Sequence, residues 1–384
     1  MDRILVGTRK GTFAVEKRDR RWRPALVGHA GVGVNFVTRD PNTGKLWALV
    51  GHGHWGAKLS VSEDQGKSWE DAAQIKYPEG ARYIGHEVSE ADPDNPASMI
   101  RPATLLKLWY MAFGSDGALY VGTIPGGLFV SRDGGKSFEL NRPLWNHESR
   151  GGDLFEGNGS GKTHWFGTPA SEGEFAAGLH SITVDPRDPK RVLVAVSTAG
   201  VLETTDGGQS WRGANQGMVN DYLPDPDAEW GHDPHFIELA KNDPDWVWQQ
   251  NHSGVFVSSD GARTWKQVSD PDKGVHFGFP VAVDDDDGKT AWLVPGKSDN
   301  ARMTIDGSLF VARTQDGGDS WEQLREGLPQ DCAHDVVYRH ALDSSKDVLC
   351  FGSTTGNLYV SEDRGESWQT VANNLPPVYS IRFG

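Results

Sequence analysis

The chain has 384 residues, of which 37% are hydrophobic and 24% are charged, and its formal net charge is −15 at pH 7. An acidic protein gains no electrostatic attraction to nucleic acid or to anionic lipid, so we expect neither as a partner. No apolar run approaches the roughly 18 residues that a membrane-spanning helix requires, so no membrane association is expected.

The cysteines and the first residues bear on the cellular compartment. Cys332 and Cys350 are the only cysteines in the sequence, and two thiols do not make a disulfide framework. The strand pattern begins at about Ile4, without the basic stretch, apolar stretch and small-residue cleavage site of a secretory signal. These features predict a cytoplasmic protein.

One eight-residue motif recurs along the chain: Ser or Thr, any residue, Asp, any, Gly, any, Ser or Thr, then an aromatic residue. Six copies occupy residues 62–69, 131–138, 204–211, 258–265, 314–321 and 361–368, and a decayed seventh copy ends at Trp22. The fourth copy has Ala262 at the Gly position. We expect the Asp to accept backbone N–H groups of its own turn, the Gly to adopt a positive φ, and the aromatic ring to pack the turn onto a sheet. The motif therefore has a structural role, and we assign it no catalytic one.

The motif is the turn of a four-stranded unit. Two β-runs precede each copy, such as 4–8 and 11–15, 118–123 and 127–131, and 348–353 and 357–361, and a further run often lies upstream, such as 34–40 and 180–185. Strands A, B and C, the Asp turn and strand D together are typical of a propeller blade. Seven units predict an all-β, seven-bladed β-propeller that fills residues 1–384 as one domain. The last run, 378–383, should complete the first blade and leave no open sheet edge.

Three insertions interrupt this repeat. The seven aromatic positions are 47, 69, 73, 54, 56 and 47 residues apart, whereas a bare blade needs about 40–50 residues. The second and third gaps are therefore predicted to hold insertions at 70–106 and 139–178, as loops without strands of their own, and 213–234 is a further long loop insertion. Each runs from a D strand to the next A strand, so all three should lie over one face, where they could form a lid.

The repeated motif resembles the Asp-box, or bacterial neuraminidase repeat (BNR), of sialidase-like propellers. Six near-consensus copies and one relic cover almost the whole chain, so the resemblance implies the fold. It implies no single activity, since similar boxes occur in sialidases, other glycoside hydrolases, sortilin-type receptor domains and photosystem assembly factors. Sialidases of the family begin their three-arginine carboxylate clamp with a Phe-Arg-Ile-Pro motif. The segment 100–102 around Arg101 is a poor match to it, so we do not expect sialidase activity.

Histidines gather on the face opposite the Asp turns, where the D–A and B–C loops should open and where a ligand site is expected. Aligning the A strands places these residues at equivalent starting positions: Asn35, Trp109, His180, His235, His276, His334 and Tyr379. Phe279 could hold this position in place of His276. The insertions and B–C loops add His52, His54, His86 and His252 to the same face.

Imidazoles that converge from successive blades can bind a transition metal such as Fe, Cu, Zn or Ni. The predicted metal ligands are His180, His235, His276 and His334. The residues predicted to line the substrate site are His52, His54, His86, His252, Asn35, Trp109 and Tyr379. The predicted acid/base carboxylates are Glu148, Asp233 and Asp335, with Glu87 and Asp153 also available. No spacing singles out a pair, so the sequence favours neither retaining nor inverting glycosidase chemistry.

Three functions fit this pattern. The first is a metal-dependent enzyme that acts on a small molecule in a His-rich funnel. The second is a metal-free glycoside hydrolase or lyase. The third is a non-enzymatic binding or assembly propeller with a protein partner, in which the histidines are dispensable.

Overall fold

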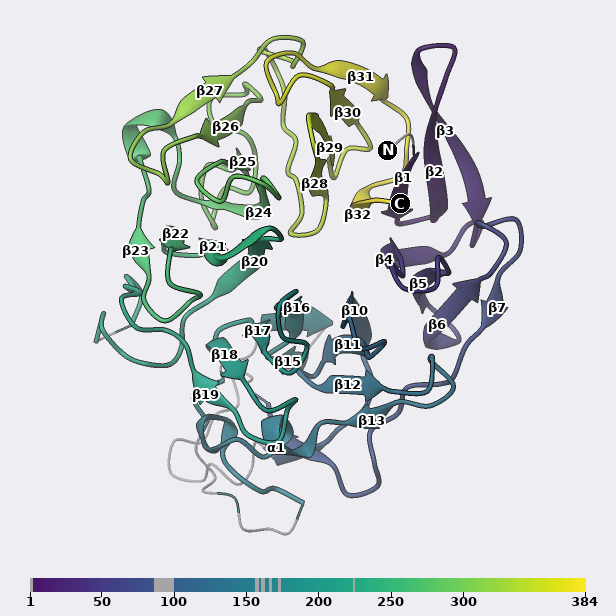
Figure 1. Ribbon diagram of the computed structural model, residues 1–384, viewed down its shortest axis with the longest axis vertical. Helices are drawn as coiled ribbons and strands as arrows, with labels where there is room; N and C mark the ends of the chain where they lie inside the picture. The colour runs from purple at the N-terminus through teal and green to yellow at the C-terminus, as the bar shows by residue number, and fades with distance from the viewer. Residues whose placement is uncertain are drawn as a thin grey trace. The chain divides into compact units, whose positions relative to one another are not determined.

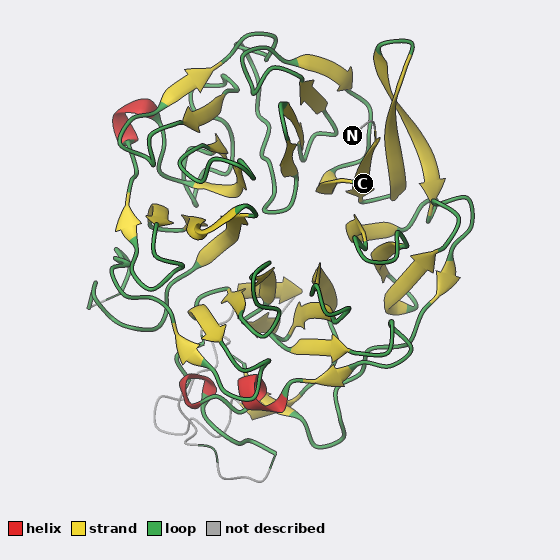
Figure 2. Ribbon diagram, in the orientation of Figure 1, coloured by secondary structure: helices red, strands yellow, loops and turns green. Residues whose placement is uncertain are grey.

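The computed structural model describes residues 3–85, 100–155, 159, 163–165, 168–171, 174–223 and 225–384. Strands dominate the described chain, and the helices are single turns (Figure 2). The strands form seven four-stranded sheets, which make the protein a seven-bladed β-propeller as the sequence predicts (Figure 1). No helix among the described residues is long and apolar enough to cross a membrane.

The seven sheets are antiparallel, and each is named below by its first strand in the following order. They are β32 (Val378–Phe383), β1 (Arg3–Thr8), β2 (Gly11–Arg18) and β3 (Arg21–Gly28); β4 (Gly33–Arg39), β5 (Leu46–His52), β6 (Gly56–Ser62) and β7 (Glu70–Asp71); β10 (Lys107–Phe113), β11 (Leu119–Ile124), β12 (Leu128–Ser131) and β13 (Glu139–Leu140); β16 (Leu179–Val184), β17 (Val192–Val196), β18 (Gly200–Thr204) and β19 (Arg212–Gly213); β20 (Pro234–Ala240), β21 (Asp243–Asn251), β22 (Gly254–Ser258) and β23 (Lys266–Gln267); β24 (Gly278–Val283), β25 (Ala291–Pro295), β26 (Val311–Thr314) and β27 (Glu322–Leu324); and β28 (Leu342–Ser345), β29 (Val348–Gly352), β30 (Leu358–Ser361) and β31 (Gln369–Ala372).

The chain divides into two compact units. The first comprises Met1–His52, Ser60–Glu70 and His235–Gly384, and the second comprises Gly53–Leu59 and Asp71–Pro234. Within each unit the core lies between neighbouring sheets. In the second unit, for example, Tyr120 and Leu128 of the β10 sheet pack with Leu179, Val194 and Leu202 of the β16 sheet.

The last strand completes the first sheet, which confirms the predicted closure. β32 pairs antiparallel with β1, so that Val6 faces Ile381, and both side chains are fully buried. Gly7 allows this close approach, since a Cβ there would lie 2.5 Å from Ser380 Oγ and 2.9 Å from Val34 O. The two chain ends therefore meet in one sheet of the first unit (Figure 1).

The predicted chemistry of the Asp turns is also confirmed. In the first copy, Ser68 donates its backbone N–H to Asp64 Oδ1 at 2.9 Å and its hydroxyl to Asp64 Oδ2 at 2.7 Å. These bonds lower the pKa of Asp64 to about 2. Gly66 has a φ of +86°, and Trp69 donates its indole N–H to Val27 O of the preceding sheet. The carboxylates of the other five copies accept the same pair of bonds: Asp133, Asp206, Asp260, Asp316 and Asp363.

The insertions differ from the prediction, because they contain short strands. β8 (Arg82–Ile84) pairs with β9 (Ile100–Pro102), and β14 (Thr168–Ser171) pairs with β15 (Glu174–Ala176). The second insertion also holds α1 (Arg142–Trp145) and the 3-10 turn η2 (Glu148–Arg150), and η3 (Pro271–Lys273) follows β23. The expectation of strand-free loops is therefore wrong, although neither pair forms a blade. Strands of three or four residues are too short to show the alternation on which sequence analysis relies.

Aromatic side chains from separate segments of the first unit pack together. The His340 ring contacts Phe36 of β4 and Phe236 of β20, both at 5.4 Å between centroids. The Arg382 guanidinium of β32 lies over the same two phenyl rings, at 4.9 and 5.6 Å. Four segments that are far apart in sequence thus meet in one cluster.

Glu238 lies two residues beyond Phe236, on the same face of β20. Its pKa is far above that of an ordinary glutamate. Burial, followed by the negative charge of Asp343, raises the pKa of Glu238 to about 8, although Arg382 and Lys241 oppose the shift. Asp343 is itself held by backbone N–H groups of Ser344 and Phe383, at 3.0 and 2.8 Å. Glu238 therefore keeps its proton to a higher pH in the folded protein than an ordinary glutamate does.

This raised pKa predicts a stability that falls with increasing pH. An unfolded Glu ionises near pH 4.5, so the contribution of Glu238 is fully present below that pH and is lost as the pH rises to about 8. We expect the melting temperature followed by circular dichroism to decline between pH 5 and 8, and to decline less in Glu238→Gln. A Glu326→Gln control, at an exposed position, should keep the wild-type slope. Identical slopes for Glu238→Gln and wild type would contradict the prediction.

Candidate functional site

The start of most A strands carries a break in strand pairing, at the positions aligned from the sequence. The pairing register shifts around Asn35 in β4, Trp109 in β10 and His180 in β16. It also shifts at Phe279 in β24 and at Tyr379 in β32. A β-bulge redirects a side chain at the end of a strand, so the same device presents one residue at the start of each of these strands.

Two of the aligned histidines do not hold this position. In β24 it belongs to Phe279, and His276 lies two residues before the strand. In the β28 sheet the A strand begins at Leu342, so His334 lies eight residues upstream and His340 takes the place next to the strand. The alternating residues around Val336 resemble a strand, but Val336 bonds instead to Thr354 of a turn. The predicted placement of His276 and His334 at the start of an A strand is therefore wrong.

The predicted histidine ligands lie in different surroundings. His180 is fully buried and its ring contacts Trp109 at 5.1 Å. His235 is also buried and stacks on Phe279 at 4.7 Å. His276 is partly exposed, and His334 is exposed with its Nε2 3.9 Å from Cys332 Sγ.

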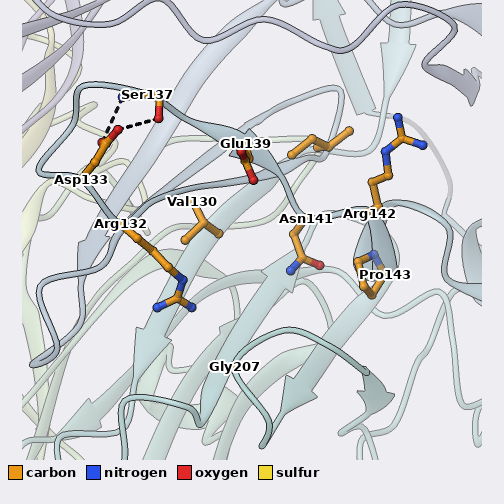
Figure 3. Close-up of a pocket in the computed structure, with 10 residues that line it drawn as sticks. Val130, Arg132, Asp133, Ser137, Glu139, Asn141, Arg142, Pro143 and Gly207 are labelled. Carbon is orange, nitrogen blue, oxygen red and sulfur yellow. Dashed lines mark hydrogen bonds between the residues drawn. The ribbon is translucent and has the colours of Figure 1, made fainter.

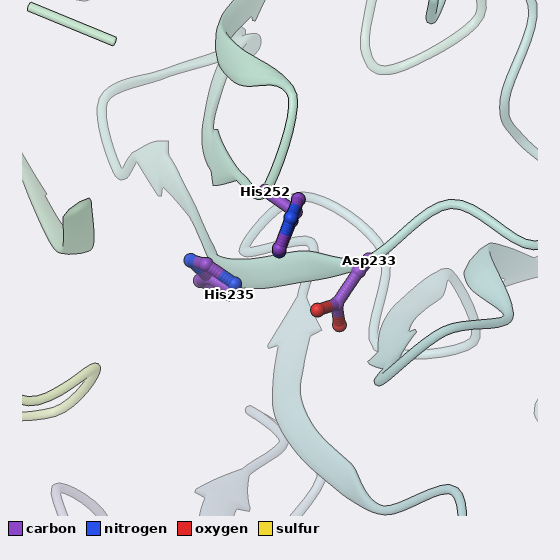
Figure 4. Close-up of side chains that lie close together, drawn as sticks. All are labelled: Asp233, His235 and His252. Atoms are coloured by element: carbon purple, nitrogen blue, oxygen red, sulfur yellow. The ribbon is translucent and has the colours of Figure 1, made fainter. Parts of the chain in front are cut away.

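One group of side chains in the described chain offers metal-ligand atoms close together, and it includes only one of the four predicted ligands. His235 and His252 of the first unit each provide such an atom, and these atoms lie within 4.8 Å of each other (Figure 4). His235 Nδ1 lies 2.5 Å from Gly278 O, so this nitrogen carries the proton and the lone pair lies on Nε2. The backbone N–H of Thr198 donates to Asp233 Oδ1 at 3.1 Å. His252, which the sequence predicted as a lining residue, thus contributes to this group.

The predicted carboxylates also differ in their surroundings. Glu148 is exposed at the start of η2, whereas Asp233 and Asp335 are buried. Asp335 accepts hydrogen bonds from the Thr355 hydroxyl and from Asn357 Nδ2, the latter at 3.2 Å. Both of these donors are neutral, and Asp335 forms no ion pair with any of the described residues.

Of the remaining predicted lining residues that the structure describes, Asn35, His52, Trp109 and Tyr379 are partly exposed and His54 is exposed. His52 is the last residue of β5 and is partly exposed, whereas His54 is exposed in the turn before β6, next to Trp55, which is 74% exposed. The Tyr379 ring lies 5.8 Å from that of Tyr338, which is 39% exposed. His86 and Glu87 lie outside the described residues, so the predictions for them stay predictions.

The second unit contains two cavities that none of the predicted site residues lines. One, of about 500 Å³, lies beside the Asp turn at 131–138 and is lined by Arg132, Asp133 and Arg142 among others (Figure 3). Asp133 accepts bonds within its own turn and Arg132 pairs with Asp116. These two side chains therefore stabilise the fold, and we assign no ligand to this cavity. The other, of about 430 Å³, is formed by the insertion after β19.

The chain is similar in sequence to two known xyloglucanases. No family model matches the chain. It is 26% identical over 227 residues to the oligoxyloglucan-reducing end-specific xyloglucanase of Emericella nidulans. The matched region covers 50% of this chain and 26% of that protein. It is also 26% identical over 175 residues to a xyloglucanase of Paenibacillus sp. Here the matched region covers 42% of this chain and 15% of that protein. The chain thus spans about a quarter or less of these relatives.

Solved structures share the fold at low sequence identity. An ancestral GH74 enzyme superimposes with a TM-score of 0.55 at 15% identity, over 88% of this chain and 38% of the other. A putative 6-phosphogluconolactonase from Bacteroides uniformis superimposes with a TM-score of 0.58 at 11% identity, over the whole of both chains. Because propellers of different described activities fit equally well, these structures bear on the fold and not on the reaction.

Proposed function

We propose that this propeller is a carbohydrate-active protein of the glycoside hydrolase type, and that its substrate is a neutral glucan such as xyloglucan. The observation that carries the proposal is the similarity in sequence to two xyloglucanases. This favours the second of the three functions that fit the sequence. The acidic surface, with a net charge of −15, is compatible with an uncharged polysaccharide and unfavourable for an anionic one.

Hydrolysis of a glycosidic bond uses a pair of carboxyl groups that flank the scissile bond, and one of them acts as general acid or base. We assign this role to Asp335, because it is buried and its bonds to Thr355 and Asn357 fix its orientation. A water-poor carboxylate with no cationic partner is suited to proton transfer. Glu148 is exposed and is a weaker candidate.

The direct test is turnover of xyloglucan and its oligosaccharides by the purified chain, followed by the release of reducing ends. The proposal expects new reducing ends from xyloglucan and none from a sialylated glycan. Absence of turnover on xyloglucan and on other neutral β-glucans would overturn it.

A second candidate function, metal-dependent catalysis, is favoured by the pair His235 and His252 of the first unit. Their ring centroids lie 5.9 Å apart, and the tautomer of His235 places a lone pair suited to a metal on Nε2. If this function holds, untagged protein should contain about one Fe, Cu, Zn or Ni ion per chain by elemental analysis, and His235→Ala with His252→Ala should lose it. His164→Ala, at an exposed position, is the control. Metal-free wild-type protein after incubation with each ion would exclude this candidate.

A further inference from the structure

The cavity after β19 lies at the end of the β16 sheet that faces away from its Asp turn. Gly213 pairs with Leu202 of β18, and the Asp turn begins at Thr204, two residues further along that strand. Asn215 continues in the opposite direction, where its Oδ1 accepts the backbone N–H of Val201 at 2.8 Å. The cavity, of about 430 Å³, thus opens beside the B–C turn, where the sequence predicts a ligand site. A volume of this order suits a small ligand.

Asn215 is one of the residues that line this cavity, and its side chain carries an unused hydrogen-bond donor. The residue is 5% exposed, and its Nδ2 has no hydrogen-bond partner among the described residues. Its carboxamide lies directly against Gly200, because a Cβ at Gly200 would be 2.7 Å from Oδ1 and 2.9 Å from Nδ2. The strand fixes Oδ1 through Val201, so the amide cannot turn over without losing that bond. A buried donor without a partner is costly, and a ligand oxygen would remove the cost.

The other walls of the cavity supply acceptors and apolar surface. Asp227 and Glu229 line it as exposed carboxylates, and none of the described lining residues is cationic. Glu229 lies over β19, since its Oε1 would be 2.8 Å from a Cβ at Gly213. Met218 and Val219 add an apolar wall, and Val219 is 40% exposed. Two carboxylates repel an anion, but they accept hydrogen bonds from hydroxyl groups.

We propose that this cavity is a subsite for one uncharged sugar unit. Asn215 Nδ2 donates to a sugar oxygen, Asp227 and Glu229 accept from sugar hydroxyls, and Met218 and Val219 contact the C–H surface of the ring. The expectation that the sugar belongs to a glucan rests on the proposed function. Binding itself does not, because it can be measured without turnover.

The test is calorimetric titration of the intact chain with xyloglucan heptasaccharide and cellotetraose in EDTA, with a glucuronic acid oligomer as the anionic comparison. Asn215→Asp keeps the acceptor for Val201 and replaces the free donor by a second acceptor. Glu229→Gln removes one charge. We expect each variant to weaken neutral-sugar binding about tenfold, or roughly 1.4 kcal/mol. Glu139→Gln, in the cavity beside the Asp turn at 131–138, should bind as wild type does.

The outcomes separate this subsite from the proposed hydrolysis. Neutral-sugar binding that both variants weaken supports the subsite even if xyloglucan is never cleaved, in which case only the proposed function fails. Unchanged affinity in both variants overturns the subsite even if xyloglucan is hydrolysed. Binding of the anionic oligomer in preference to neutral sugars, or of Ca²⁺ alone when EDTA is omitted, also overturns it.

Discussion

Replacement of Asp335 by Asn is expected to lower the rate of xyloglucan hydrolysis by about two to four orders of magnitude, the usual contribution of one acid/base group. Asn has nearly the same shape, and its Oδ1 can still accept the bond from the Thr355 hydroxyl. It loses the ability to exchange a proton and the acceptor that Asp335 Oδ2 offers to Asn357 Nδ2. The loss should therefore appear in kcat, with KM within a few-fold of wild type.

The control for this variant is Asp319→Asn, which removes an exposed carboxylate that pairs with Lys266. Both variants should melt within a few degrees of wild type, so that a lower rate can be attributed to chemistry. An Asp335→Asn protein that hydrolyses xyloglucan at the wild-type rate would remove Asp335 from the reaction. It would leave the proposed function to another carboxylate.

Replacement of Gly356 by Ala is expected to destabilise the protein by about 3 kcal/mol or more. Gly356 has a φ of +88°, and a Cβ there would lie 1.8 Å from the backbone oxygen of Leu375. The left-handed conformation alone costs Ala roughly 1 kcal/mol, and a clash with backbone cannot be relieved by rotating a side chain. The measurement is the midpoint of urea unfolding, with the slope checked for two-state behaviour.

Gly117→Ala is the matched control, because Gly117 has a φ of +85° and a Cβ there would meet no other atom within 4 Å. It should lose only the roughly 1 kcal/mol of the conformation. Equal losses in the two variants would show that the backbone near Leu375 yields to the methyl group. Since Gly356 lies between Thr355 and Asn357, its replacement should also disturb the bonds that hold Asp335.

The repeat made the architecture predictable, because each Asp turn is specified by residues within eight positions of one another. Asp64 and Ser68 bond within one such segment, and Gly66 supplies the positive φ that the turn needs. Counting the turns gives the number of blades. The pairing of β32 with β1 followed from the same count, since the last strand had no other place in the repeat.

The candidate site was less predictable, because its residues meet through contacts between distant segments. The strand-like residues around Val336 were assigned to an A strand, whereas the structure uses Leu342–Ser345 and brings His340 against Phe36 and Phe236. No local pattern distinguishes these two segments. The choice depends on which of them pairs with β29, and Leu342 pairs with Phe351.

Turn chemistry repeated along the chain is enough to specify the blade strands, the Asp turns, the seven blades and the strand that completes the first of them, because each depends on residues close together in the sequence. Which side chains share a site depends on the folded chain as a whole. Folding places His252 with His235, and Asn215 beside Glu229 in one cavity, because loops without a repeat take their course from the surfaces on which they pack.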